Sequence, residues 1–348
     1  MAATSNHITS VAPPEGIITS VVPDSPPVYD APQNGANQQL LSRLNLDLRG
    51  TLFPVDREQL MLLPESVLLG LFPQGLILSK PASSEGADDG IFTVDFDPQC
   101  FQYILDFWAT AQTSFYGTPT TPGYFHAQQT MCQSDPALDQ QSNPLLSKQA
   151  IIVLREELEY FSITKPGAEA RTNMMTGLAN EELRALRRNC GKALVKKRRI
   201  FTALQRNVNK ENNQAEQHLI DMLCMSGFER DDEWGFRACE PARNVISSMA
   251  LVLLKTGIIH PTPPDAPPEQ SQAPYIDLDQ INTAQKLLLF WRKPARKCWW
   301  DGIEVEVPAS LKSKGEMIKV KVWARRVWTL ELSLVSLYVT MYFFTLRF

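Results

Sequence analysis

Few residues of this chain have the type and spacing that catalysis requires. Asp95-Phe96-Asp97 contains two close carboxylates, which suggests the aspartate nucleophile of a phosphatase. Pro98 follows directly, however, and an Asp-Pro pair is typical of a helix start. We therefore interpret Asp95 as strand surface and Asp97 as a helix cap. Because the sequence also has no phosphate-binding glycine loop and no nucleophile elbow, we predict that the protein is not an enzyme.

Metal and cofactor binding are not expected either. His218, Cys224 and Cys239 could be combined into a metal site, but they lack the tight spacing of about two to four residues that zinc ligands show. The six cysteines have no paired framework, and residues 1–10 have neither the basic start nor the apolar run of a signal peptide. These features predict free cysteines in a reducing compartment, either cytoplasm or nucleus.

A basic group could bind phosphates or carboxylates, although the net charge of the whole chain is only -4. In residues 180–207 the apolar side chains recur at helical spacing, which predicts one long amphipathic helix. Three interpretations of its basic face remain open: a solvated surface, a docking site for an acidic or phosphorylated partner, and nuclear import or nucleic-acid contact. The basic residues are Arg184, Arg187, Arg188, Lys192, Lys196, Lys197, Arg198, Arg199 and Arg206.

Tryptophans and cations occur together near the C-terminal end. Trp299 and Trp300 follow Arg296 and Lys297, which favours either core packing or a recognition patch. With the basic group, this defines the candidate partner-binding residues. They are Arg187, Arg188, Lys196, Lys197, Arg198, Arg199, Arg296, Lys297, Trp299 and Trp300.

Residues 43–165 are expected to form the first folded domain. Leucines at 44, 46 and 48 alternate as in a half-buried strand, and Arg49-Gly50 predicts a hairpin turn. Short helices follow at Asp56 and Pro64, then a strand at residues 91–96 and an amphipathic helix after Asp97-Pro98. A polar insertion at 112–143 is predicted to be disordered. Apolar residues at helical spacing then predict a helix over residues 151–161.

The remaining chain divides by composition. Residues 1–42 are predicted to be a disordered tail, 166–178 a linker, 179–260 a helical region with the basic helix, and 261–274 a stiff proline-rich linker or a ligand for a polyproline-binding domain. Residues 275–335 are a Trp-rich α+β region. There, Trp299-Trp300-Asp301-Gly302 predicts a turn, and alternation predicts an antiparallel pair in which Glu304 and Glu306 face Lys319 and Lys321. Residues 336–348 are an apolar tail shorter than the about 20 residues that span a bilayer, either a gene-model artefact or a weak membrane-associating segment.

The order of elements in residues 44–53, 64–72 and 92–105 resembles a BTB/POZ fold of the potassium-channel tetramerisation (KCTD, T1-like) kind. The first hairpin departs from that family by having one glycine, Gly50, where a pair is usual. The resemblance implies an α+β fold with an N-terminal BTB/POZ domain, a helical middle region and a small C-terminal Trp-rich sheet. It also implies a non-enzymatic module that binds partner proteins or copies of itself.

Two further segments, 297–302 and 322–333, extend the similarity over residues 40–335 to a fungal growth-regulation family of the Whi-two type. That resemblance implies a non-catalytic adaptor that works with membrane-associated protein phosphatases in the general stress response and restrains target-of-rapamycin signalling. Its partners would be a phosphatase and signalling proteins, without nucleic acid and with membrane contact only through partners. A cytoplasmic location is expected, with recruitment to the plasma membrane or a nuclear location as alternatives. A substrate adaptor for a cullin-type ubiquitin ligase and a nuclear regulator using the basic helix are alternative functions.

Overall fold

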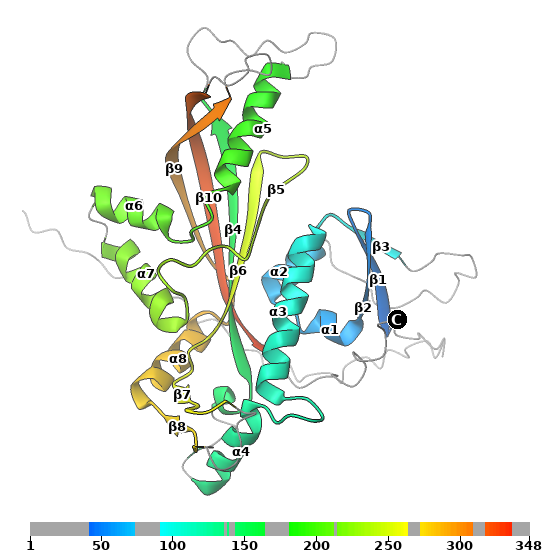
Figure 1. Cartoon of the computed structure of the whole chain (residues 1–348), viewed down its shortest axis with the longest axis vertical. Helices are drawn as coiled ribbons and strands as arrows, with labels where there is room; N and C mark the ends of the chain where they lie inside the picture. The colour runs from blue at the N-terminus through cyan, green and yellow to red at the C-terminus, as the bar shows by residue number, and fades with distance from the viewer. Residues whose placement is uncertain are drawn as a thin grey trace, which may run out of the picture.

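The computed structural model describes residues 42–73, 91–135, 138, 143–163, 181–211, 214–263, 272–308 and 317–335. Over these ranges the fold is α+β, as predicted, with sheets of three, five and two strands (Figure 1). The predicted N-terminal tail except Ser42, the 166–178 linker and the apolar tail lie outside the described residues.

The N-terminal module, residues 43–116, begins with a sheet in the order β2-β1-β3. β1 (Arg43–Leu48) and β2 (Thr51–Asp56) form the predicted hairpin, and β3 (Ile91–Val94) lies parallel to β1. Arg49 and Gly50 form the turn with φ angles of 50° and 89°. Two left-handed residues match the twist of a hairpin with a two-residue loop. The helices α1 (Arg57–Met61) and α2 (Glu65–Leu71) follow, starting where Asp56 and Pro64 predict.

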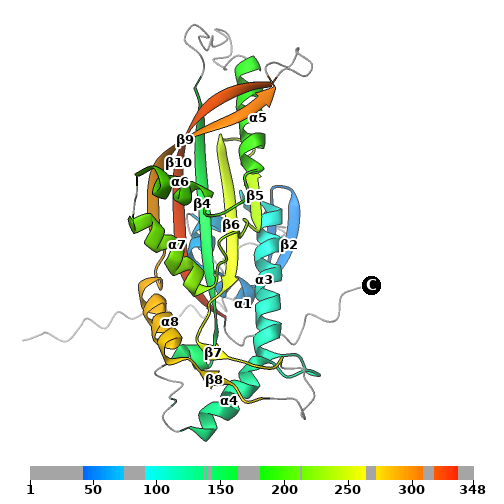
Figure 2. The same ribbon diagram turned by 60° about the vertical axis from the view of Figure 1, so that its left-hand side comes forward.

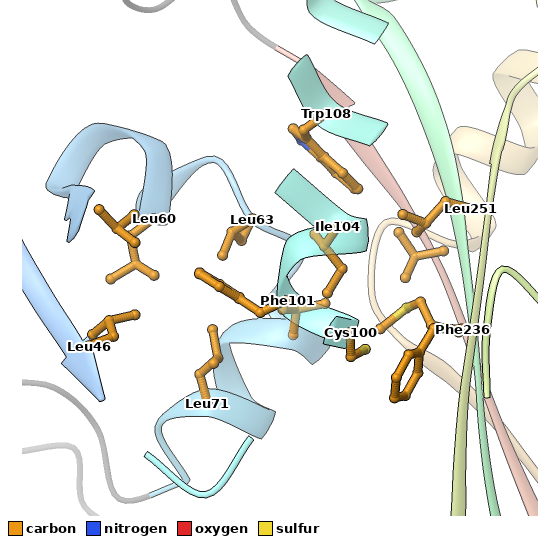
Figure 3. Packing of buried hydrophobic residues seen from close by; sticks show 14 of the residues in the cluster. Leu46, Leu60, Leu63, Leu71, Cys100, Phe101, Ile104, Trp108, Phe236 and Leu251 are labelled. Atoms are coloured by element: carbon orange, nitrogen blue, oxygen red, sulfur yellow. The ribbon is translucent and has the colours of Figure 1, made fainter. Parts of the chain in front are cut away.

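Helix α3 (Pro98–Tyr116) joins this module to the large sheet. The Asp97 side chain accepts hydrogen bonds from the backbone N–H groups of Gln99 and Cys100, so the predicted cap is confirmed. Figure 3 shows α3 between Leu46 of the small sheet and Leu251 of the large one. The N-terminal module and the large sheet therefore share one apolar core.

The five-stranded sheet has the order β5-β6-β4-β10-β9. These strands are β4 (Gln149–Ser162), β5 (Phe236–Cys239), β6 (Val245–Leu253), β9 (Ala295–Pro308) and β10 (Met317–Val335). They come from three of the regions expected from the sequence, so those regions share one sheet. The pairing of Glu304 with Lys321 and of Glu306 with Lys319 confirms the predicted antiparallel register, but the sheet is not small.

The predicted helix over residues 151–161 is wrong, because this segment is β4, the central strand. Its first half, from Ile151 to Leu154, is fully buried on both faces. A strand covered on both faces loses its alternation and cannot be distinguished from a buried helix by periodicity. Trp299-Trp300-Asp301-Gly302 is likewise not a turn, because it lies inside β9.

Helices cover one face of the sheet (Figures 1 and 2). They are α5 (Glu181–Val195), α6 (Thr202–Glu211), α7 (Gln214–Ser226) and α8 (Leu278–Phe290). The single helix predicted over 180–207 is therefore two helices, broken where Ile200 and Phe201 enter the core. The region 179–260 is also not wholly helical, because it contains β5, β6 and β7 (Ile258–Ile259).

The predicted disordered insertion at 112–143 is also corrected. α3 continues to Tyr116, and α4 (Tyr124–Ser134) and a short 3-10 helix (Pro144–Leu146) follow. Tyr124 and Gln128 of α4 both contact His260, the latter at 3.0 Å. β7 pairs with β8 (Tyr275–Ile276) nearby. Contacts with residues far along the chain thus support a helix whose own sequence is weakly apolar.

Candidate functional site

Three aromatic side chains form an exposed cluster on the large sheet. Phe161, Trp300 and Trp323 come from β4, β9 and β10 and have exposed fractions of 46%, 56% and 47%. The ring of Trp300 lies 6.2 Å from that of Phe161 and 6.5 Å from that of Trp323, measured between centroids. We call these three residues the aromatic cluster. Exposed rings grouped in this way are typical of protein interaction surfaces.

The register of the strands puts these rings together. Trp323 lies opposite Phe161 on β4 and opposite Gly302 on β9. A Cβ atom at Gly302 would be 3.5 Å from the Trp323 ring, an ordinary van der Waals contact, so the indole lies directly over this position of β9. Alternate residues of these strands point to the helix-covered face and are buried, which leaves the aromatic cluster on the other face.

Charged side chains surround the aromatic cluster. Arg325 lies opposite Trp300 on one side and Glu159 on the other, and its Nε is 3.2 Å from the Glu159 carboxylate. Farther along the same face are the Glu304–Lys321 and Glu306–Lys319 pairs. The surface therefore has an apolar centre and a rim of both signs, as partner-binding surfaces commonly do.

A polar cleft of about 300 Å³ lies between this face and the N-terminal module. Arg49 joins its two sides, because its guanidinium contacts Asp95 at 2.6 Å, Asp97 at 3.7 Å and Glu240 at 2.5 Å. Burial alone would lower the pKa of Arg49, but the hydrogen bonds to Asp95 and Glu240 raise it. Asp97 is thus the predicted helix cap, whereas Asp95 lies just past the end of β3, which stops at Val94, and is an ion-pair partner of Arg49.

A row of charges crosses the helix-covered face under the aromatic cluster. Glu156 of β4 is 1% exposed and accepts hydrogen bonds of 2.6 Å from both Arg237 and Arg326, and one of 3.0 Å from Trp328. Arg326 continues the row to Asp301 at 3.6 Å. Burial opposes the charge on Glu156, yet the neighbouring Arg326 and Arg237 lower its pKa. Glu156 and Asp301 together provide the negative charges that balance Arg237 and Arg326.

Two of the four predicted cations at 196–199, Lys197 and Arg198, bind other parts of the protein through their side chains. Lys197 Nζ donates to the Glu304 carbonyl at 3.2 Å, and partial burial together with Arg206 lowers the pKa of Lys197. Arg198 donates to the Trp234 carbonyl and pairs with Glu233 at 3.3 Å, and Arg199 forms a backbone bridge to Glu233. These contacts hold the break between α5 and α6. Lys196 is exposed.

The second predicted group, on β9, is split between two faces of the sheet. Trp300 is exposed, whereas Trp299 packs 5.4 Å from Trp328 on the helix-covered face. Lys297 lies over the Trp299 ring and pairs with Glu216 at 3.2 Å. Arg296 is exposed. Of this group, Trp300 belongs to the aromatic cluster, while Trp299 and Lys297 stabilise the core.

Arg187 and Arg188 lie on α5 beside a cavity of about 590 Å³ that Arg184, Lys192 and Arg243 also line. Arg184 and Lys192 belong to the basic face predicted from the sequence, whereas Arg243, which lies beyond β5, does not. Phe161 and Arg325 of the exposed sheet face were not among the predicted binding residues either. The alternation of buried and exposed side chains along β4 and β10 would have placed them on the exposed face. That pattern can be used only if residues 151–161 are recognised as a strand.

The described residues contain no group of three or more His, Cys, Asp or Glu side chains arranged to hold a metal ion. None of the helices in the described ranges is long and apolar enough to cross a membrane.

No family model matches the chain. It is 34% identical over 291 residues to a WHI2-like protein of Schizosaccharomyces pombe, an alignment that covers 83% of this chain and 86% of that protein. The chain belongs to the WHI2-like family. A relative of Saccharomyces cerevisiae named growth regulation protein is 27% identical over an alignment of 489 residues, which covers 92% of this chain and 99% of the relative. Membership of the WHI2-like family confirms the family prediction from the two Trp segments.

Proposed function

We propose that this WHI2-like chain is a non-catalytic adaptor in growth control and the general stress response. It acts through a protein phosphatase and restrains target-of-rapamycin signalling, in the cytoplasm and at the plasma membrane where partners recruit it. Growth control is supported by the S. cerevisiae relative, which is named a growth regulation protein. The same alignment covers nearly the whole of both chains, so the described sheet and helices fall within the shared part.

The aromatic cluster is the observation that carries the adaptor proposal. Trp300 and Trp323 are each about half exposed, yet they are held on strands of the central sheet rather than on loops. Tryptophan and arginine contribute most to binding at protein interfaces, and rigid presentation lowers the entropy lost on association. Arg325, next to both rings in the register, adds a cation at the same place.

The N-terminal module is proposed to be BTB/POZ-like and to form homo-oligomers. Support comes from its sheet order, in which β3 lies parallel to β1 beside the β1–β2 hairpin, and from the Asp97 cap of α3. Exposed Leu52 and Met61, each 62% exposed, provide apolar contact surface on this module.

Affinity capture from starved yeast cells tests the proposal. The intact chain should recover a protein phosphatase, and Trp300→Ala combined with Trp323→Ala should reduce that recovery at least about tenfold, because interface tryptophans commonly cost 2 kcal/mol or more when truncated. Phe290→Ala is the matched control, since Phe290 is 75% exposed but lies on α8, away from the aromatic cluster. The purified chain alone should hydrolyse no phosphate ester.

Other results would decide for another function. Recovery of a cullin and ubiquitin-ligase subunits in place of a phosphatase would favour a substrate adaptor for ubiquitination. Binding of nucleic acid with a steep salt dependence, lost when Lys196 and Arg199 are reversed in charge, would favour a nuclear regulator. Recovery of the same phosphatase by the double tryptophan variant would show that the aromatic cluster is not the docking surface.

A further inference from the structure

Cationic side chains predominate in the lining of the cavity beside α5. Five cationic side chains face it, four from α5 and one from the β5–β6 turn. They are Arg184, Arg187, Arg188, Lys192 and Arg243. The one carboxylate in the lining is Glu240, whose two oxygens are already bound to Arg49 and to the Ser247 hydroxyl, at 2.5 and 2.6 Å. The cavity therefore carries a strong excess of positive charge.

Several of these cations have no partner within the described part of the chain. Arg184, Arg187, Lys192 and Arg243 make no side-chain ion pair or hydrogen bond there. By contrast, Arg198 and Arg206, which follow on the same stretch of sequence, are both paired with acidic side chains. Concentrating like charges without a counter-charge is unfavourable, and an anionic ligand relieves that cost.

A tyrosine hydroxyl group also lines this cavity. Tyr160 of β4 is 4% exposed and lines the cavity, and its Oη makes no hydrogen bond with any described residue. Burial raises the pKa of Tyr160 to about 12, so the phenol keeps its proton near neutral pH and can donate it to an acceptor. The hydroxyl group is open to the cavity, so it can hydrogen-bond to water or to a ligand that enters there.

The sequence of α5 keeps this hydroxyl at the cavity. Gly191 faces the ring, and a Cβ atom at that position would lie 2.3 Å from Tyr160 Oη. Glycine is costly inside a helix, by about 1 kcal/mol relative to alanine. Its presence allows α5 to approach the sheet closely enough for Arg187 and the Tyr160 hydroxyl to line one site.

We propose that this cavity binds the phosphate group of a phosphorylated side chain in a partner protein. Guanidinium groups hold phosphate oxygens through paired charge-assisted hydrogen bonds, and a neutral hydroxyl supplies a further donor. A cavity of about 590 Å³ also has room for the residue that carries the phosphate. Nucleic acid fits less well, because the aromatic cluster lies on the opposite face of the sheet and offers no stacking surface beside these cations. The inference rests on the proposed function, because an adaptor for a phosphatase has to hold a phosphorylated protein.

The test uses the full chain and a library of random peptides with a central phosphoserine, phosphothreonine or phosphotyrosine. Fluorescence anisotropy should show binding of phosphorylated pools and none of their unphosphorylated twins. Arg187→Ala and Arg243→Ala should each raise the Kd roughly 10- to 100-fold, as expected for losing hydrogen bonds to a charged group. Tyr160→Phe should raise it less and leave the fold intact. Arg292→Ala is the control, because it removes the same positive charge from an exposed residue at the end of α8.

Several results would overturn the proposal. One is equal binding of phosphorylated and unphosphorylated pools, and another is unchanged binding by Arg187→Ala and Arg243→Ala. Tight binding of phosphoinositide vesicles or RNA that depends on Arg187, without binding of any phosphopeptide pool, would assign the cavity to a different ligand. Phosphatase capture is a separate readout. Loss of capture with phosphopeptide binding intact would refute the proposed function alone.

Discussion

Replacing Glu156 with glutamine tests whether the buried row of charges stabilises the sheet. The substitution preserves volume but removes the charge that lies between Arg237 and Arg326. In the native chain, Arg237, Arg326 and Trp328 donate to the two carboxylate oxygens of Glu156. In the variant only one amide oxygen can accept from these donors, and the new NH₂ group faces a guanidinium group. Arg237 would keep only the Ser248 hydroxyl as its partner. The variant thus leaves Arg237 without an acidic partner inside the protein, while Arg326 keeps only Asp301, at 3.6 Å.

The expected cost follows from burial. Both members of the Glu156–Arg237 pair have side chains that are 1% exposed, so water does not screen the loss. Removing one partner of such a pair typically costs about 3–5 kcal/mol. For a chain of 348 residues, that corresponds to a decrease in Tm of about 4–7 °C. Thermal and urea unfolding followed by circular dichroism would measure it.

Glu157→Gln is the control, one residue away on the opposite face. Its side chain is 56% exposed and lies 3.9 Å from Arg155, so the same chemical change should alter stability by less than about 0.5 kcal/mol. If Glu156→Gln cost less than about 1 kcal/mol, or if both variants lost equal stability, the reasoning about the buried charges would be refuted.

The same pair of proteins predicts a pH dependence. Because the pKa of Glu156 is lowered from 4.5, its ionised form adds stability above the unfolded pKa. That contribution is lost as the pH falls through the lower pKa of the folded state. The difference in free energy of unfolding between the native chain and Glu156→Gln should therefore be largest at neutral pH and decrease below about pH 4.3. A difference that stays constant into acid would contradict the sign of the pKa shift.

Three further predictions concern the joints of the fold. Gly191→Ala should lower the free energy of unfolding by about 1–3 kcal/mol, because the added methyl group pushes α5 away from Tyr160 Oη. Adding Tyr160→Phe to that variant should restore part of the lost stability. If the two substitutions instead lowered stability additively, the close approach of Gly191 to Tyr160 would be contradicted. Arg49→Ala should lower the free energy of unfolding by about 1–3 kcal/mol and speed amide hydrogen exchange at the β1–β2 turn, because the contacts to Asp95 and Glu240 are lost. Unchanged exchange would show that the contact to Glu240 is dispensable. Asp97→Ala should cost about 1 kcal/mol while Asp97→Asn costs less, because asparagine also caps a helix, and equal losses would argue against the cap.

Local signals predicted the N-terminal module well. Arg49-Gly50, Asp97-Pro98 and the alternating leucines of β1 act over a few residues, and the structure has the turn, the cap and the strand where they are expected. Such features depend on backbone conformation and on neighbours along the chain.

The large sheet could not be predicted in the same way. β4 pairs with β6 and β10, whose partner residues lie far along the chain, and its apolar first half has no periodicity because both faces are covered. α4 has a weakly apolar sequence, and its contacts with His260 come from a distant segment. Long-range contacts of this kind outweigh local preference.

Residue types alone identified the cations and tryptophans as the candidates for binding, and composition suggested what they could bind. Their grouping was decided by tertiary structure. Strand register brings Trp300 and Trp323 to Phe161 on an exposed face while it turns Trp299 into the core, and the packing of α5 brings Arg187 to Arg243 and the Tyr160 hydroxyl. The physical reason is that side-chain chemistry belongs to each residue, whereas the face on which it lies depends on a pairing register set by segments more distant in sequence.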